Sequence, residues 1–224
     1  MGEAAAKQEK ARGSAEGKAG ERTPDRSNPR AQALLDAAEA LLAETGYEGL
    51  SARAVAERAG VNKGLVFYYW GSTAELFEQV LERYYAAHKA SLAESFAGEG
   101  SLRERVHEVI DVYLDFMETH RAYARIVQQQ VSSGGPHVGL VRRHLSEVLG
   151  MTTAMLAEVT PESGPLAARH FHLSLSAVVI NYFTYAPILG EGFWGTDPFG
   201  EEALAERRAH VHWVVDAWLA ALER

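Results

Sequence analysis

The residues best suited to chemistry lie between positions 52 and 70, where small and apolar side chains have the spacing of two helices that cross through a tight turn. Ala56 stands where the two backbones nearly touch, and Gly60 stands where the turn requires a left-handed residue. Val66 provides an inward apolar contact. The second helix begins at Lys63, and a cationic helix N-terminus can meet phosphates or base edges. The spacing predicts a DNA-binding helix-turn-helix, and an ordinary helical hairpin remains the alternative.

Other patterns that could support catalysis or cofactor binding fail on their context. The GxGxxG string at 190–195 follows a helical pattern instead of a strand, so we expect a loop there. Glu104 and His107 form one Glu-x-x-His, whereas a di-iron site needs two copies. Two pairs of histidines stand only two residues apart and point to different sides of a helix. The sequence has no cysteine, P-loop or nucleophile elbow, so we expect no enzyme, metal or cofactor.

Helix-start signals position these residues. Pro29 after Asn28 begins the first of three short helices, and Ser72 and Ser101 each have a glutamate three residues later, as in capping boxes. Further helical periodicity covers residues 123–131, 138–159, 165–186 and 201–222. No strand alternation is found, so the sequence predicts an all-α fold.

Composition divides the chain into three parts. Residues 1–29 hold no large apolar side chain apart from Met1, which predicts a disordered tail. We expect residues 30–71 to form the three-helix DNA-binding domain and residues 72–224 a larger helical domain for effector binding and dimerisation. The net charge is −8, but the first 70 residues hold 10 basic and 10 acidic side chains. An N-terminal part without net charge can approach DNA, whereas the acidic rest of the chain is repelled from it.

The sequence also bears on location. Leu34 is the first leucine, isoleucine, valine or aromatic residue, so the N-terminal part lacks the apolar segment of a secretory signal. The uncharged run between Arg169 and Glu191 is interrupted by histidines, serines, Asn181 and Pro187. We therefore expect this run to be a helix of a soluble cytoplasmic protein and not a membrane span.

From Arg30 to Leu76 the chain resembles the TetR family of bacterial regulators. The resembling sequence is RAQALLDAAEALLAETGYEGLSARAVAERAGVNKGLVFYYWGSTAEL, with AxxAGVxxGxxxYY as its specific part. The resemblance implies a homodimer that binds a double-stranded DNA operator and is controlled by a small-molecule effector. By position it implies DNA contacts at Arg30, Ser51, Arg53, Lys63, Gly64, Leu65, Tyr68, Tyr69 and Thr73.

The resemblance gives the first five of these residues distinct roles. Arg30 and Ser51 would contact backbone phosphates, and Arg53 and Lys63 would reach base edges. Gly64 would permit close approach to the duplex. Operator sequence is not implied by the resemblance.

The aromatic run that follows is expected to divide between DNA and core. Tyr68 and Tyr69 would contact phosphate oxygens and thymine methyl groups, whereas Phe67 and Trp70 would pack inside. Departures from the family's usual lysine, histidine and polar residue occur at Thr73, Tyr69 and Leu65, respectively. Fewer cations imply weaker nonspecific DNA binding. The alternative is a small-molecule-binding helical protein with weakened DNA binding.

The helices after residue 72 are expected to supply the dimer and effector surfaces. The helix at 165–186 is apolar on more than one face and should be buried all round. The resemblance implies that the last two long helices pair with those of a second copy in a four-helix interface, a role that suits Val211, Val214, Val215, Trp218 and Leu222. Aromatic and scattered polar side chains predict a cavity for a largely apolar, aromatic or acyl effector. Its candidate residues are Tyr113, Phe116, Met117, His120, Tyr123, Gln128, Met151, Met155, Phe171, Asn181, Tyr182 and Tyr185. We therefore expect a repressor that leaves a pseudo-palindromic operator when effector binds.

Overall fold

The computed structural model describes residues 24–222, so most of the predicted tail, residues 1–23, lies outside the described residues. Across 24–222 the chain is helical without a strand, which confirms the all-α prediction. Three helices form what we call the head: α2 (Pro29–Thr45), α3 (Ala52–Arg58) and α4 (Gly64–Trp70). The helices that we call the body are α5 (Thr73–Ala97), α6 (Leu102–Thr119), α7 (Ala122–Ser133), α8 (Val138–Leu156), α9 (Ala168–Trp194) and α10 (Glu201–Leu222).

Side-chain caps begin the body helices where the sequence places them. Ser101 and Glu104 form a complete capping box at the start of α6, as expected. At the start of α5 only half of the expected box forms, because the Ser72 amide donates to the carbonyl of Trp70 at 2.7 Å. The Ser72 hydroxyl still accepts from the Glu75 amide at 3.1 Å.

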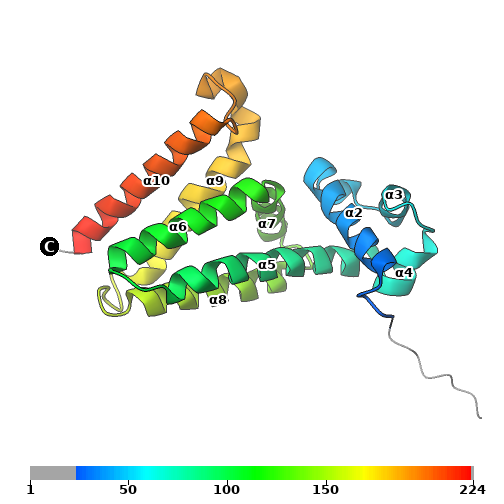
Figure 1. The fold of residues 1–224 in the computed structure, drawn as a ribbon, viewed down its shortest axis with the longest axis horizontal. Helices are drawn as coiled ribbons and strands as arrows, with labels where there is room; N and C mark the ends of the chain where they lie inside the picture. Colours follow the sequence, from blue (N-terminus) through cyan, green and yellow to red (C-terminus); the bar gives the residue numbers. More distant parts are fainter. Residues whose placement is uncertain (1–23, 223–224) are drawn as a thin grey trace, which may run out of the picture.

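Helix α5 runs from the head into the body and contributes buried side chains to both (Figure 1). Near its start, Leu76 and Phe77 are fully buried, and Leu92 is buried near its end. The Phe77 ring lies 4.6 Å from the ring of Tyr47, in the short 3-10 turn Tyr47–Gly49, and 4.9 Å from that of His137. Phe77 therefore packs where the head meets the body.

Polar contacts add to this junction. Arg83 of α5 forms ion pairs with Asp36 at 2.6 Å and Glu39 at 2.9 Å, both on α2. From α7, the Arg125 guanidinium donates to the carbonyl of Ala43, near the end of α2, at 3.1 Å. Both contacts hold α2 against the body.

Helix α9 extends further than the sequence predicts. It continues past residue 186 to Trp194, through Pro187, with a kink at Gly190 whose φ of 58° is left-handed. The expected loop at 190–195 is therefore wrong: only Gly190 departs from helical geometry within α9, and Gly195 ends the helix. Pro187 does not end the helix, because helical residues continue on both sides of the kink at Gly190.

The expectation that α9 is buried all round is also wrong for the single chain. Leu173 is 64% exposed and Ile188 is 78% exposed, because the contacts of α9 with α6, α7, α8 and α10 leave these two side chains uncovered. On α10, Val211 and Val215 are fully buried within the chain, while Trp213 is 65% exposed. Among the described helices, α9 alone is long and apolar enough to cross a membrane by length and composition.

Candidate nucleic-acid interface and body cavity

The turn between α3 and α4 has the geometry that the sequence predicts. Gly60 has a left-handed φ of 65°, and the Val61 amide donates to the carbonyl of Ala56 at 3.0 Å. Val55 and Val66 are fully buried, so both helices pack inward through these side chains. The N-terminus of α4 is left facing solvent, and this surface could lie in a DNA groove.

At this N-terminus, Asn62 and Gly64 act together. The Asn62 side chain accepts a hydrogen bond from the Gly64 amide at 2.8 Å. A Cβ on Gly64 would lie 3.2 Å from the side-chain Oδ1 of Asn62, which is tighter than ordinary van der Waals contact. Glycine therefore fits the cap locally as well as permitting close approach. The Lys63 ammonium lies 5.9 Å from the Phe67 ring centre, in a cation–π arrangement along the exposed side of α4.

The nine expected DNA contacts separate by exposure. Leu65 and Thr73 are half-buried. Tyr69 is only 8% exposed and belongs to the head core, whereas Tyr68 is 58% exposed. The remaining exposed members are Arg30, Ser51, Arg53, Lys63 and Gly64. The structure thus places Tyr68, but not Tyr69, where a ring could reach DNA without rearrangement.

Two further residues at this surface differ from expectation. Phe67 is 47% exposed instead of buried, because Trp70 and Val66 already fill the inward face of α4. Arg26, in the segment predicted to be tail, donates to the carbonyl of Tyr69 at 3.0 Å and lies over the Trp70 ring. The sequence signal for Arg26 was weak, because it stands before the first helix in a stretch without apolar residues.

The body encloses a cavity of about 50 Å³ between α5, α6, α7, α8 and α9. Four of the twelve candidate effector residues line it, and four polar residues that the sequence analysis missed join them. The four expected lining residues are Tyr113, Tyr123, Met155 and Phe171. The four missed polar residues are His88, Thr152, His172 and Ser176. Single polar residues on apolar helices give no spacing signal, so they could be found only from the fold.

The other eight candidates lie elsewhere. Phe116 and Met117 are core residues, Met151 is half-buried, and the Tyr182 hydroxyl donates to the carbonyl of Pro198 at 2.5 Å. A surface groove of about 940 Å³ beside α7 and α9 contains Gln128, Asn181 and Tyr185, and a second groove of about 760 Å³ contains His120.

Burial controls protonation in the cavity wall. Burial, with a smaller contribution from nearby histidines, lowers the pKa of His88 to about 3. Burial also lowers the pKa of His144 to about 4 and lowers that of His172. His88 Nδ1 and His144 Nε2 are 3.0 Å apart, so one of these uncharged rings donates to the other. The wall is therefore uncharged at neutral pH.

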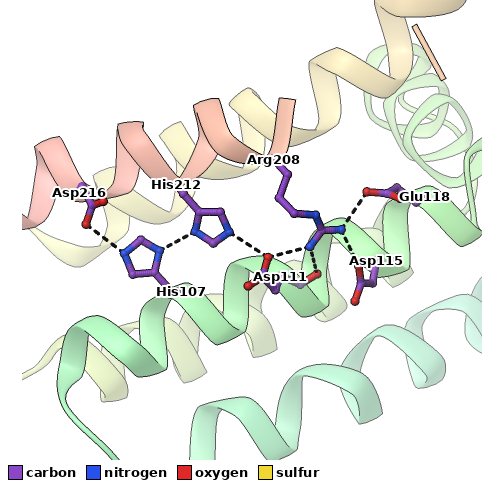
Figure 2. A network of polar contacts seen from close by, with 7 residues as sticks. All are labelled: His107, Asp111, Asp115, Glu118, Arg208, His212 and Asp216. Atoms are coloured by element: carbon purple, nitrogen blue, oxygen red, sulfur yellow. Dashed lines mark hydrogen bonds and ion pairs between the residues drawn. The ribbon is translucent and has the colours of Figure 1, made fainter. Parts of the chain in front are cut away.

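A polar network joins α6 to α10 on the other side of the body (Figure 2). The Nδ1 atoms of His107 and His212 are 2.5 Å apart, His107 Nε2 faces Asp216 at 3.0 Å, and His212 Nε2 faces Asp111 at 2.9 Å. Both Nε2 atoms donate to carboxylates, so the Nδ1 contact is a hydrogen bond only when one ring carries a second proton.

The network extends through Arg208, which forms ion pairs with Asp111 at 2.7 Å, Asp115 at 2.5 Å and Glu118 at 2.9 Å. In the sequence, His107 and His212 stand in spacings with Glu104 and His210 that do not suit a metal site. The missed signal is that each has an aspartate four residues later, which is the spacing of one helix face. Within residues 24–222, no group of three or more histidine and carboxylate side chains has the geometry to hold a metal ion.

We expect His212→Ala to lower the free energy of unfolding by roughly 1 kcal/mol, since Asp111 loses a half-buried hydrogen-bond partner and His107 loses its contact with the His212 ring. Urea titration followed by circular dichroism measures the change. His210→Ala, an exposed histidine on the same helix, is the matched control and should change stability little. Equal stability of the two variants would show that the network does not stabilise the fold.

Comparison with known proteins supports the interpretation of the head. Residues 34–80 match the family described as "Bacterial regulatory proteins, tetR family". The uncharacterized HTH-type transcriptional regulator YhgD of Bacillus subtilis is 26% identical over 105 residues, which cover 47% of this chain and 55% of YhgD. The HTH-type transcriptional activator FasR of Mycolicibacterium smegmatis is 25% identical over 162 residues, covering 72% of each chain.

Solved structures show the same fold. A transcriptional regulator from Rhodococcus sp. has a TM-score of 0.64 and 22% identity, and the match covers 84% of this chain and 95% of that one. The fatty acid degradation regulator FadR from Bacillus halodurans has a TM-score of 0.64 and 14% identity, with 83% of this chain and 95% of that chain covered. At these identities the likeness concerns the arrangement of head and body helices.

Proposed function

We propose that this chain, which is similar to the bacterial TetR family in its head and in its helical fold, is a homodimeric transcriptional repressor, released from a pseudo-palindromic operator when a small, largely apolar effector binds in the body. The observation that carries the DNA-binding part is the exposed N-terminus of α4, with Lys63 and Gly64 at its start and Val66 buried behind it. We place the protein in the bacterial cytoplasm, where such an operator is found.

Apolar residues exposed on the last two helices support the dimer. Leu173, Ile188 and Phe193 of α9 and Trp213 of α10 are each at least 64% exposed in the single chain. Large apolar side chains left exposed on a single chain are typical of a protein interface. A two-fold pair would place two recognition helices about 34 Å apart, one turn of DNA.

The enclosed cavity supports the effector. It lies between helices that also reach the head junction, so an effector that favours one arrangement of these helices changes operator affinity by the same coupling free energy. About 1–3 kcal/mol of coupling is typical of such regulators. Repression is the simplest output of this arrangement: the empty protein occupies the operator and the filled protein leaves it.

The test begins with selection of genomic fragments by the purified protein, followed by footprinting of the selected site. A dimer should protect two half-sites one turn apart. We expect Lys63→Ala to weaken operator binding by about 1–3 kcal/mol, since Lys63 would lose a base contact. Lys89→Ala, which removes an ion pair with Glu147 in the body, is the matched control and should leave affinity unchanged.

Two outcomes would contradict the proposal. If Lys63→Ala binds the selected operator as tightly as the unaltered protein, Lys63 reads no base. If no genomic fragment is retained at low salt, the alternative is favoured, in which the chain binds small molecules and its DNA binding is weakened. The burial of Tyr69 and the half-burial of Thr73 favour this alternative, because both residues were expected to contact DNA.

A further inference from the structure

The enclosed cavity differs from an ordinary core void in having a fixed polar atom at its wall. His88 is 5% exposed and lines the cavity, and its Nε2 is buried without a hydrogen-bond partner. A buried polar atom without a partner costs free energy, so such an atom at a cavity wall indicates a missing ligand group.

The His88 ring cannot turn easily to find another partner. Its Nδ1 is occupied by His144 Nε2 at 3.0 Å, and its faces stack on Phe116 and Tyr113 at centroid distances of 4.5 and 5.1 Å. The ring is therefore held in one position. The free Nε2 is presented at a fixed place, as a binding site requires.

The rest of the wall has no charged side chain: none of its lining residues is lysine, arginine, aspartate or glutamate. The other polar atoms are already paired in part, since Thr152 Oγ1 donates to the carbonyl of Val148 at 3.1 Å and also contacts His172 Nδ1 at 3.1 Å. An ionised ligand would lose its hydration here and find no opposite charge to replace it.

From this wall we infer that the cavity takes an uncharged ligand, mainly an alkyl or acyl chain with a single hydroxyl, ester or ketone group, and that this group hydrogen-bonds to Nε2 of His88. The inference deepens the proposed function, since it names the class of effector. Free carboxylic acids, which are ionised at neutral pH, are excluded from the class.

Entry of such a chain also requires the wall to move. A volume of about 50 Å³ holds only a few water molecules. A longer chain must displace flexible side chains such as Met155 and Leu92, which line the cavity on α8 and α5.

The test is a titration calorimetry series at neutral pH with three probes of equal chain length: 1-decanol, methyl decanoate and decanoate. We expect at least one of the two uncharged probes to bind, and decanoate to bind at least about tenfold more weakly. Decanoate binding as tightly as the uncharged probes would overturn the inference. Absence of binding by all three probes would overturn it as well.

Variants locate the polar contact. His88→Leu keeps an apolar side chain but removes the hydrogen-bonding atom, so we expect the tighter uncharged probe to lose about fivefold or more in affinity. His170→Leu, at an exposed position of α9, is the control and should bind as the unaltered protein does. Unchanged affinity in His88→Leu would overturn the assignment of His88. If that variant does not fold, His88→Gln and the probe series remain as tests.

These titrations contain no DNA, so their result is separate from that of the operator experiment. If the protein binds its operator but none of the three probes, only the inferred class of ligand is contradicted. Successful titrations without operator binding would remove only the repressor role.

Discussion

Replacing Phe77 by alanine is expected to lower the free energy of unfolding by about 3–5 kcal/mol, since it leaves a large cavity where head and body meet. Phe77 is fully buried and packs edge-on against Tyr47 and His137. These two neighbours come from opposite sides of the junction, so neither can collapse into the space without moving its own element. Urea unfolding at a fixed protein concentration, followed by circular dichroism, measures the loss.

Phe67→Ala is the matched control for this prediction. Phe67 is a phenylalanine of the head that is 47% exposed, so its loss should cost less than about 1 kcal/mol. A Phe77→Ala variant as stable as Phe67→Ala would show that the junction is not packed as described. Operator binding of the Phe77→Ala variant should fall with its folded fraction.

Acidification from pH 6.5 to 4.5 is expected to reduce stability by an amount on the order of 3 kcal/mol, because His88 and His144 stay uncharged in the folded protein. Burial lowers the pKa of His88 to about 3 and that of His144 to about 4. In the unfolded chain each ring takes up a proton below its ordinary pKa of about 6.5. Their contribution is therefore complete above that pH and is lost as the pH falls.

Carboxylates with lowered pKa values, such as Asp111 and Asp216, contribute in a different range. Their contribution is present above their unfolded pKa and is lost only as the pH falls below about 4. Urea titrations between pH 7.5 and 4.5 thus report mainly on histidines. In His88→Gln the pH dependence should become shallower, whereas in His170→Gln it should not change. Parallel curves for both variants would contradict the prediction.

The head could be predicted from the sequence because its constraints are local. Caps, the turn glycine at Gly60 and the inward spacing of Val55 and Val66 each act within a few residues. The division of the α4 aromatics into two exposed residues, Phe67 and Tyr68, and two buried ones, Tyr69 and Trp70, could not be predicted. Which of Phe67 and Tyr69 turns inward depends on how α4 packs against the rest of the head, and Arg26 reaches back to Tyr69 from outside the helices.

The helices of the body could be predicted from the sequence, but the cavity that they form could not. The cavity takes residues from five helices, and polar members such as His88 and Thr152 stand among apolar lining residues. The network at His107 and His212 likewise depends on α6 meeting α10, although both helices carry the same histidine-to-aspartate spacing. The length of α9 was misjudged because Pro187 and Gly190 were read as a stop, whereas helical residues resume beyond them.

A movement at the cavity wall would reach the head through helix α5. From Leu76 in the head core to His88 in the cavity wall it spans twelve residues, or about 18 Å at the rise of an α-helix. Rotating α5 by about 5° around His88 would displace Leu76 by about 1.6 Å. In a two-fold pair the recognition helices would move in opposite senses, so their separation could change by about 3 Å against the fixed pitch of the duplex.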